Sequence, residues 1–282
     1  MRKTLTWEER TRDTRQKGGT QRLAGAQEYT RDLENATGGS IHPGDHAMTP
    51  HSDHGPARPW LTCVAPLVVL LATGLFEPTP SATGLAASLG IPYSAYPLVY
   101  AIRIALGVVV LSVAWSSLRP WLGTPTWWPP LLGLALVVPW VILAQLQRDA
   151  GWTFGMGERA GYNPFDTGNL GDTPALAWTF LAMRAFVPLA EELFLRGFLM
   201  RYAMEERFWT VPFGTLTFTS AAACILYAVG SHPAEAVAAV GWFAIVSGVA
   251  AATRKPIDCI LCHAATNLAL GAYVLATDSW WL

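Results

Sequence analysis

The sequence predicts an all-α membrane protein, a polytopic bundle of about seven transmembrane helices with a disordered N-terminal tail. The chain has 282 residues, of which 52% are apolar and 14% charged. Residues 1–58 hold 17 of the 39 Asp, Glu, Lys and Arg residues, so the rest of the chain is far poorer in charge than soluble domains are. Long apolar runs with many tryptophans follow position 59, as in helices that cross a bilayer.

Two domains follow from this division. Residues 1–58 are polar and charged, and they cannot bury enough apolar surface to offset the entropy of ordering, so we expect a disordered cytoplasmic tail. The four histidines of the tail read as part of a solvated linker. Residues 59–282 form the transmembrane domain, with a motif core at 174–282.

Seven apolar stretches make up the predicted transmembrane domain. Most have about the 17 to 25 residues that cross a hydrocarbon core, and each must be helical because lipid offers no partner to an unpaired backbone amide. The stretches lie near 60–76, 94–117, 127–146, 174–200, 211–231, 236–252 and 257–276.

The orientation is predicted from the Lys and Arg residues that flank the spans, because cytoplasmic flanks carry an excess of them. One side has only Arg148 and Arg159, within an external loop at about 147–173. The other side, which holds the N-terminus, is therefore cytoplasmic. Its basic residues are Arg58, Arg119, Arg201, Arg207, Arg254 and Lys255.

Charged residues inside the spans are the first candidates for function, because each costs about 2.5 to 3.5 kcal/mol at the bilayer centre. They concentrate in the run RAFVPLAEELFLRGFLMRY. Glu192 and Arg196 are four residues apart and share a helix face, whereas Glu191 is rotated by about 100° and can face elsewhere. A structural ion-pair network between helices is the alternative. Arg103 lies near the end of its span, where it can snorkel to the interface.

Two histidines and an asparagine extend this set. His232 lies near the end of the fifth span, and His263 lies in the seventh with Asn267 one turn later on the same face. Each could be a simple interhelical hydrogen bonder. Their occurrence beside a Glu pair in an otherwise apolar domain favours one joint site. A simple seven-span arrangement puts His232 towards the external end of its helix and the other site residues nearer the cytoplasmic half.

The segment Cys259, Cys262 and His263 has the C-x-x-C-H spacing of haem c attachment. That chemistry needs an exposed segment, and the sequence IDCILCHAATNLALG instead reads as the start of a membrane helix. We therefore expect these cysteines to be small packing residues.

The ordered motifs resemble the CAAX-protease and bacteriocin-processing family of intramembrane endopeptidases. They are E-E-x-x-x-R at Glu191 to Arg196, a following His at 232, and H-x-x-x-N at His263 and Asn267. The run around Glu191 and the ending HAATNLALGAYVLATDSWWL are similar to the bacterial branch that accompanies exosortase and PEP-CTERM sorting systems. The family's second motif usually reads F-x-x-x-H, whereas this chain has Ala228 four residues before His232 and the aromatic residue Tyr227 next to it.

The resemblance implies a glutamate-activated peptide hydrolysis without a cofactor. Glu191 with His232 would hold and deprotonate water, while His263 and Asn267 would donate hydrogen bonds to the oxyanion. Glu192 and Arg196 would orient the site. A zinc-dependent membrane protease is one alternative, because two His and a Glu make a three-ligand set. A non-catalytic scaffold or immunity protein is another.

Localisation and partners follow from the same resemblance. We expect an integral protein of the bacterial inner membrane whose partners are lipid and a membrane-associated protein or peptide substrate, with a functional link to an exosortase sorting system. The formal net charge of −1 gives no indication of nucleic-acid binding.

Overall fold

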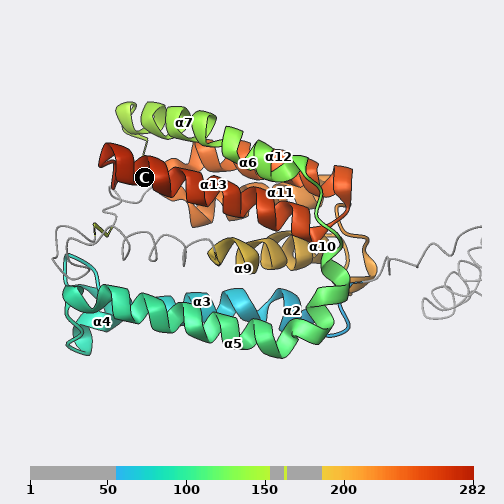
Figure 1. Cartoon of the computed structure of the whole chain (residues 1–282), viewed down its shortest axis with the longest axis horizontal. Helices are drawn as coiled ribbons and strands as arrows, with labels where there is room; N and C mark the ends of the chain where they lie inside the picture. The colour runs from blue at the N-terminus through green and yellow to red at the C-terminus, as the bar shows by residue number, and fades with distance from the viewer. Residues whose placement is uncertain (1–54, 153–161, 164–185) are drawn as a thin grey trace, which may run out of the picture. The chain divides into compact units, whose positions relative to one another are not determined.

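The computed structural model describes residues 55–152, 162–163 and 186–282, all within one compact unit, Pro50–Leu282. These residues form helices joined by turns, with no strand among them, which confirms the all-α class (Figure 1). Arg184, Arg159, the tail up to residue 54 and the first part of the span expected at 174–200 lie outside the described residues.

The helices follow the expected apolar stretches, except that the helix in the stretch at 211–231 begins only at Phe218 and that two stretches contain a break. The first stretch is divided at Val64, and the third at Leu136. In chain order the elements are α2 (Pro59–Cys63), α3 (Ala65–Gly74), α4 (Gly84–Ser88), η1 (Tyr93–Ala95), α5 (Tyr96–Leu122), α6 (Trp128–Ala135), α7 (Val137–Asp149), α9 (Val187–Phe194), η2 (Leu195–Leu199), α10 (Met200–Tyr202), η3 (Phe208–Thr210), α11 (Phe218–Ser231), η4 (Pro233–Glu235), α12 (Ala236–Thr253) and α13 (Pro256–Thr277).

Four helical segments of the described chain are long and apolar enough to cross a membrane. Two shorter apolar helices, α3 and α11, accompany them. A helical membrane bundle is therefore confirmed, with six of the seven expected stretches represented by these helices. The four long segments are Tyr93–Leu122, Trp128–Asp149, Pro233–Thr253 and Pro256–Thr277.

Residues 55–58, which the sequence assigns to the tail, lie against the bundle. The backbone amide of Gly55 donates to the carbonyl of Trp209 at 2.8 Å, and that of Arg58 donates to Ser117 Oγ at 2.8 Å. The packed domain thus includes these residues as well as those from 59 onward.

Helix α9 lies between two groups of helices, which puts its side chains at the centre of the domain. It contacts α3 and α2 on one side and α13 on the other (Figure 1). Leu67, Leu70, Ile104 and Ala190 form one buried cluster where α3, α5 and α9 meet. A second and larger cluster surrounds Phe243 on α12 and extends over α11 and α13.

Helices α6 and α13 approach each other closely at Gly133. A Cβ atom at that position would lie 2.1 Å from the carbonyl oxygen of Cys262, so only glycine fits without moving a helix. Thr266 fixes the same contact, because its hydroxyl donates to the carbonyl oxygen of Gly133 at 2.8 Å. This contact sets the position of His263, which follows Cys262 on α13.

Candidate active site

The two glutamates of the E-E-x-x-x-R motif lie on α9, immediately before a π-helical turn at Leu195–Leu199 that contains Arg196. π-Helical turns inside α-helices occur frequently at functional sites, because they re-aim side chains relative to the regular helix. Glu192 points into the bundle, and its side chain is 2% exposed; that of Glu191 is 14% exposed.

Glu192 and Arg196 form the ion pair that their spacing predicts. Arg196 Nη1 donates to Glu192 Oε2, and the Arg196 side chain is 1% exposed. Arg196 Nη2 also donates to the carbonyl oxygen of Phe243 at 2.8 Å, which ties α9 to α12. The pair is thus buried with further hydrogen bonds, the condition under which a buried ion pair is tolerated.

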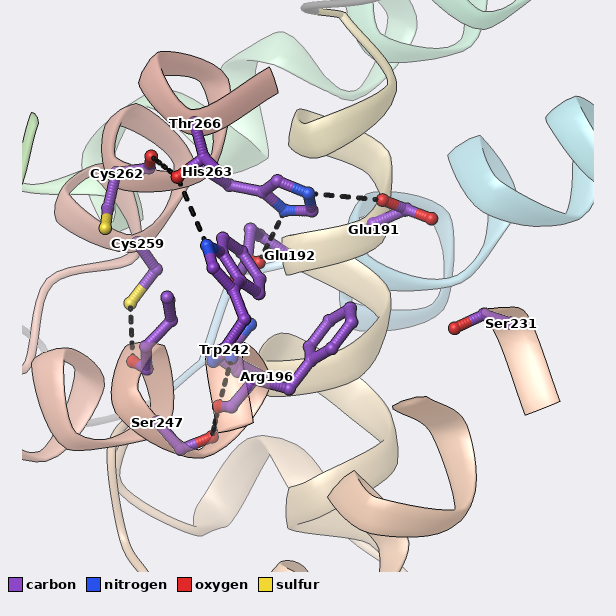
Figure 2. Close-up of polar contacts among 12 residues, drawn as sticks. Glu191, Glu192, Arg196, Ser231, Trp242, Ser247, Cys259, Cys262, His263 and Thr266 are labelled. Atoms are coloured by element: carbon purple, nitrogen blue, oxygen red, sulfur yellow. Dashed lines mark hydrogen bonds and ion pairs between the residues drawn. The ribbon is translucent and has the colours of Figure 1, made fainter. Parts of the chain in front are cut away.

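His263 lies between the two glutamates (Figure 2). Its Nδ1 is 2.9 Å from Glu192 Oε1, and its Nε2 is 3.6 Å from Glu191 Oε2. Because Glu192 already accepts a hydrogen bond from Arg196, we assign the hydrogen of its contact with His263 to Nδ1 of the ring. Nε2 is then the ring nitrogen left for Glu191 and for a substrate.

Trp242 fixes the other face of the His263 ring. The two ring centroids are 4.3 Å apart, and Trp242 Nε1 donates to Thr266 Oγ1 at 3.1 Å. Ligand and catalytic histidines are held in one orientation by such neighbouring contacts. The imidazole is therefore fixed by a carboxylate on one ring nitrogen and an indole packed against the ring.

A cavity of about 390 Å³ opens beside His263 and Trp242, a size within the usual range of small-molecule sites, and Glu191 and Glu192 are not among the residues that line it. His232, His263 and Asn267 all line it. His232 ends α11, accepts or donates a 2.8 Å hydrogen bond at Nδ1 with Ser231 Oγ, and lies 5.6 Å from the ring of Trp140. The cavity runs along α13, and it is lined both by His232 at the end of α11 and by His263 nearer the middle of α13.

Tyr227 is a residue that the motif pattern did not single out for function. Its hydroxyl donates to Glu191 Oε1 at 3.4 Å, and its ring packs on Phe194 and Phe243. The sequence signal was present, because the aromatic residue expected four positions before His232 is displaced by one position to Tyr227. The displacement brings a hydroxyl to the glutamate, which a phenylalanine could not supply.

Two sequence-based alternatives can be compared with this geometry. Cys259 and Cys262 are completely buried, as expected for packing residues and unlike cysteines exposed for haem attachment. Within the described ranges no group of three or more His, Cys, Asp and Glu side chains is arranged to hold a metal ion.

Comparison with known proteins gives one match, over the region that carries these residues. Residues 173–269 match the type II CAAX prenyl endopeptidase Rce1-like family model. The Rce1-like segment covers about a third of the chain and contains Glu191, His232, His263 and Asn267. It supports the resemblance to CAAX-type membrane proteases. Searches of curated proteins and of solved structures found no match.

Proposed function

We propose that this chain is an intramembrane endopeptidase that hydrolyses membrane-associated substrates with water activated by Glu191. The observation that carries the proposal is His263 placed between Glu191 and Glu192 beside the cavity. The Rce1-like match over the same residues supports a protease. Because polar groups in a membrane bundle are costly, two carboxylates in contact with a histidine that lines a cavity favour chemistry over packing.

Glu191 is better suited to act as the base than Glu192. Glu192 is occupied by Arg196 and by His263 Nδ1, whereas the contacts of Glu191 with His263 and Tyr227 are long, at 3.6 and 3.4 Å. Long contacts leave lone pairs on Glu191 for a water molecule. In the proposed reaction the carboxylate takes a proton from that water and later returns it to the leaving amine.

The remaining residues would stabilise the oxyanion and hold the water. His263 Nε2 and the Asn267 amide are one helical turn apart on α13, so both would donate to one developing negative charge when His263 carries a hydrogen on each ring nitrogen. His232 on the cavity wall would orient the water with Glu191. Glu192 and Arg196 act through His263, by holding its ring in place.

The zinc-dependent mechanism predicts a different response to metal removal. A glutamate enzyme keeps its activity after dialysis against a strong chelator, whereas a zinc enzyme loses it and regains it when zinc is restored. Cleavage that is abolished by the chelator and restored by zinc would replace the glutamate mechanism.

The substrates proposed are membrane-anchored proteins, including those of an exosortase sorting system, in a bacterial inner membrane with the N-terminus in the cytoplasm. The resemblance of the sequence motifs supports this choice. Proteins that accumulate uncleaved in cells whose only copy of the chain carries Glu191→Gln are the candidate substrates. The purified wild-type chain in liposomes should then cleave them. If the chain is a non-catalytic scaffold, wild-type cells and Glu191→Gln cells should contain the same membrane proteins.

A further inference from the structure

The two ends of the helical bundle differ in charge. At one end, which we call the basic end, the cationic residues lie at the termini of α2, α5 and α10 and in the turn between α12 and α13. Lys255 Nζ donates to Thr126 Oγ1 at 3.3 Å, and Arg201 lies beside Gly55, so these segments meet in space. The basic residues of this end are Arg58, Arg119, Arg201, Arg207, Arg254 and Lys255.

The opposite end, which we call the cavity end, is formed by the other ends of the long helices (Figure 1). The side chain of Gln147, near the end of α7, donates to the carbonyls of Trp152 and Ala234 at 2.9 and 2.8 Å. The Arg148 guanidinium lies 4.6 Å from the ring of Trp281. Thus the end of α7, the start of α12 and the segment after α13 lie together.

The cavity opens at the cavity end. Its floor is buried, with His263 and Thr266 at 4% and 2% exposure, whereas Thr79 and Pro80 on its rim are exposed. Its rim comes from the segments after α3 and α13, and none of the six basic-end residues lines it. The cavity therefore extends from the site towards the end that is poorer in cations.

Cytoplasmic flanks of membrane proteins are richer in Lys and Arg, so the charge difference orients the bundle. The basic end then faces the cytoplasm. We infer that the cavity receives its peptide substrate from the non-cytoplasmic side of the membrane. This inference rests on the proposed protease function only in that it calls the bound molecule a substrate. The direction of the opening depends only on the charges at the two ends and on the geometry of the cavity.

The depth of the site defines the kind of substrate. From His263 to Thr277, where α13 ends, the helix rises by about 21 Å. An extended chain covers that distance in about six or seven residues. The substrate class is therefore a membrane-anchored protein with an unfolded segment on the non-cytoplasmic side, long enough to reach the floor of the cavity.

Cysteine labelling tests the direction of the opening without needing activity. The four native cysteines are buried, so a maleimide that cannot cross membranes has no exposed thiol in the parent chain. Thr79→Cys places a thiol on the rim, and Thr210→Cys places one in η3 at the basic end; both threonines are exposed. We expect Thr79→Cys to react in spheroplasts and Thr210→Cys only in inside-out vesicles. The reverse pattern would overturn the inference.

A second pair of variants tests whether the interior of the cavity opens to the same side. Leu270 lines the cavity, whereas Leu268, two positions earlier on α13, is 42% exposed on the lipid-facing surface. We expect Leu270→Cys to react in spheroplasts and Leu268→Cys to stay unlabelled, because a thiol in lipid is not reached by a water-soluble reagent. Labelling of Leu270→Cys only in inside-out vesicles, no labelling of it, or equal labelling of both variants would overturn the inference.

The same labelling in a Glu191→Gln background separates this inference from the proposed function. The pattern should be unchanged, because the direction of the opening does not depend on the reaction. A chain that labels as expected but cleaves nothing would refute the protease proposal alone. A chain that cleaves its substrate but labels from the cytoplasmic side would refute the inference alone.

Discussion

Two carboxylate–guanidinium pairs among the described residues have sharply different surroundings. Glu192 and Arg196 have side chains 2% and 1% exposed, and they contact His263 and a backbone carbonyl of α12. Glu77 and Arg103 are 2.6 Å apart with side chains 20% and 16% exposed, near the end of the bundle. The chemistry of the two pairs is the same, but only the first pair adjoins another titratable pair, Glu191 and His263.

The difference shows how depth separates an ion pair that links two helices near the interface from one that adjoins the candidate site. Arg103 also donates from Nε to the carbonyl oxygen of Leu70 at 2.7 Å, so it links α5 to the end of α3. A guanidinium near the interface costs little, because its long side chain reaches polar surroundings. The Glu192–Arg196 pair, the inner pair, has no such route to water. It lies where it can hold the ring of His263 in place.

Loss of the Glu191 carboxylate should give the largest difference between the two regions. We expect Glu191→Gln to lower the cleavage rate by about 10² to 10⁴, the usual contribution of a general base, because the amide cannot take a proton from water. Glu77→Gln, in the outer pair at the mouth of the cavity, should change the rate far less, and the exposed Glu205→Gln, away from the cavity, is the control that should leave it unchanged. The measurement is cleavage of an identified substrate in liposomes at equal protein abundance. Equal rates for wild type and Glu191→Gln would refute the glutamate mechanism.

Removal of one partner from each ion pair should separate the two regions in stability. Arg196→Met leaves Glu192 buried without its counter-charge, so we expect a loss of about 3 to 5 kcal/mol in the free energy of unfolding in detergent. Arg103→Met should cost about 0 to 1 kcal/mol, since Glu77 can reach water. A similar loss for both variants would show that burial does not distinguish the pairs.

The parts of the inner site that lie on one helix could be predicted from sequence. The spacing of Glu192 and Arg196 and that of His263 and Asn267 each place two side chains on one helix face, whatever the packing. The apolar lengths likewise predicted the long helices. These are local properties: Glu192 and Arg196 form the buried ion pair, and His263 and Asn267 both line the cavity.

The parts that join different helices could not be predicted in the same way. The approach of α6 to α13 at Gly133 and the contact of Trp242 with His263 depend on how α6, α12 and α13 pack, which a single sequence does not encode locally. The breaks at Val64 and Leu136 were hidden by continuous apolar composition. The sequence did not show that His232 and His263 line the same cavity, because the cavity forms only when the helices pack.

Asn267 offers a sharper test of the inner region, because the outer pair has no equivalent residue. We expect Asn267→Ala to lower the cleavage rate by about 10² to 10³, as for the loss of one oxyanion donor. The effect should appear in kcat more than in KM, since the donor acts on charge that develops in the transition state. A change in KM alone would place Asn267 in substrate binding instead.

Tyr227 should give the smallest effect, because its hydrogen bond to Glu191 is long. Tyr227→Phe removes the hydroxyl and keeps the ring that packs on Phe194 and Phe243. A neutral donor to a carboxylate contributes about 1 kcal/mol, so we expect the cleavage rate to fall by about three- to tenfold with little change in stability. Tyr273→Phe on the exposed side of α13 is the control and should leave the rate unchanged. A role in positioning the Glu191 carboxylate also predicts that the loss appears in kcat with little change in KM. A raised KM with an unchanged kcat would mean that Tyr227 acts through substrate binding instead.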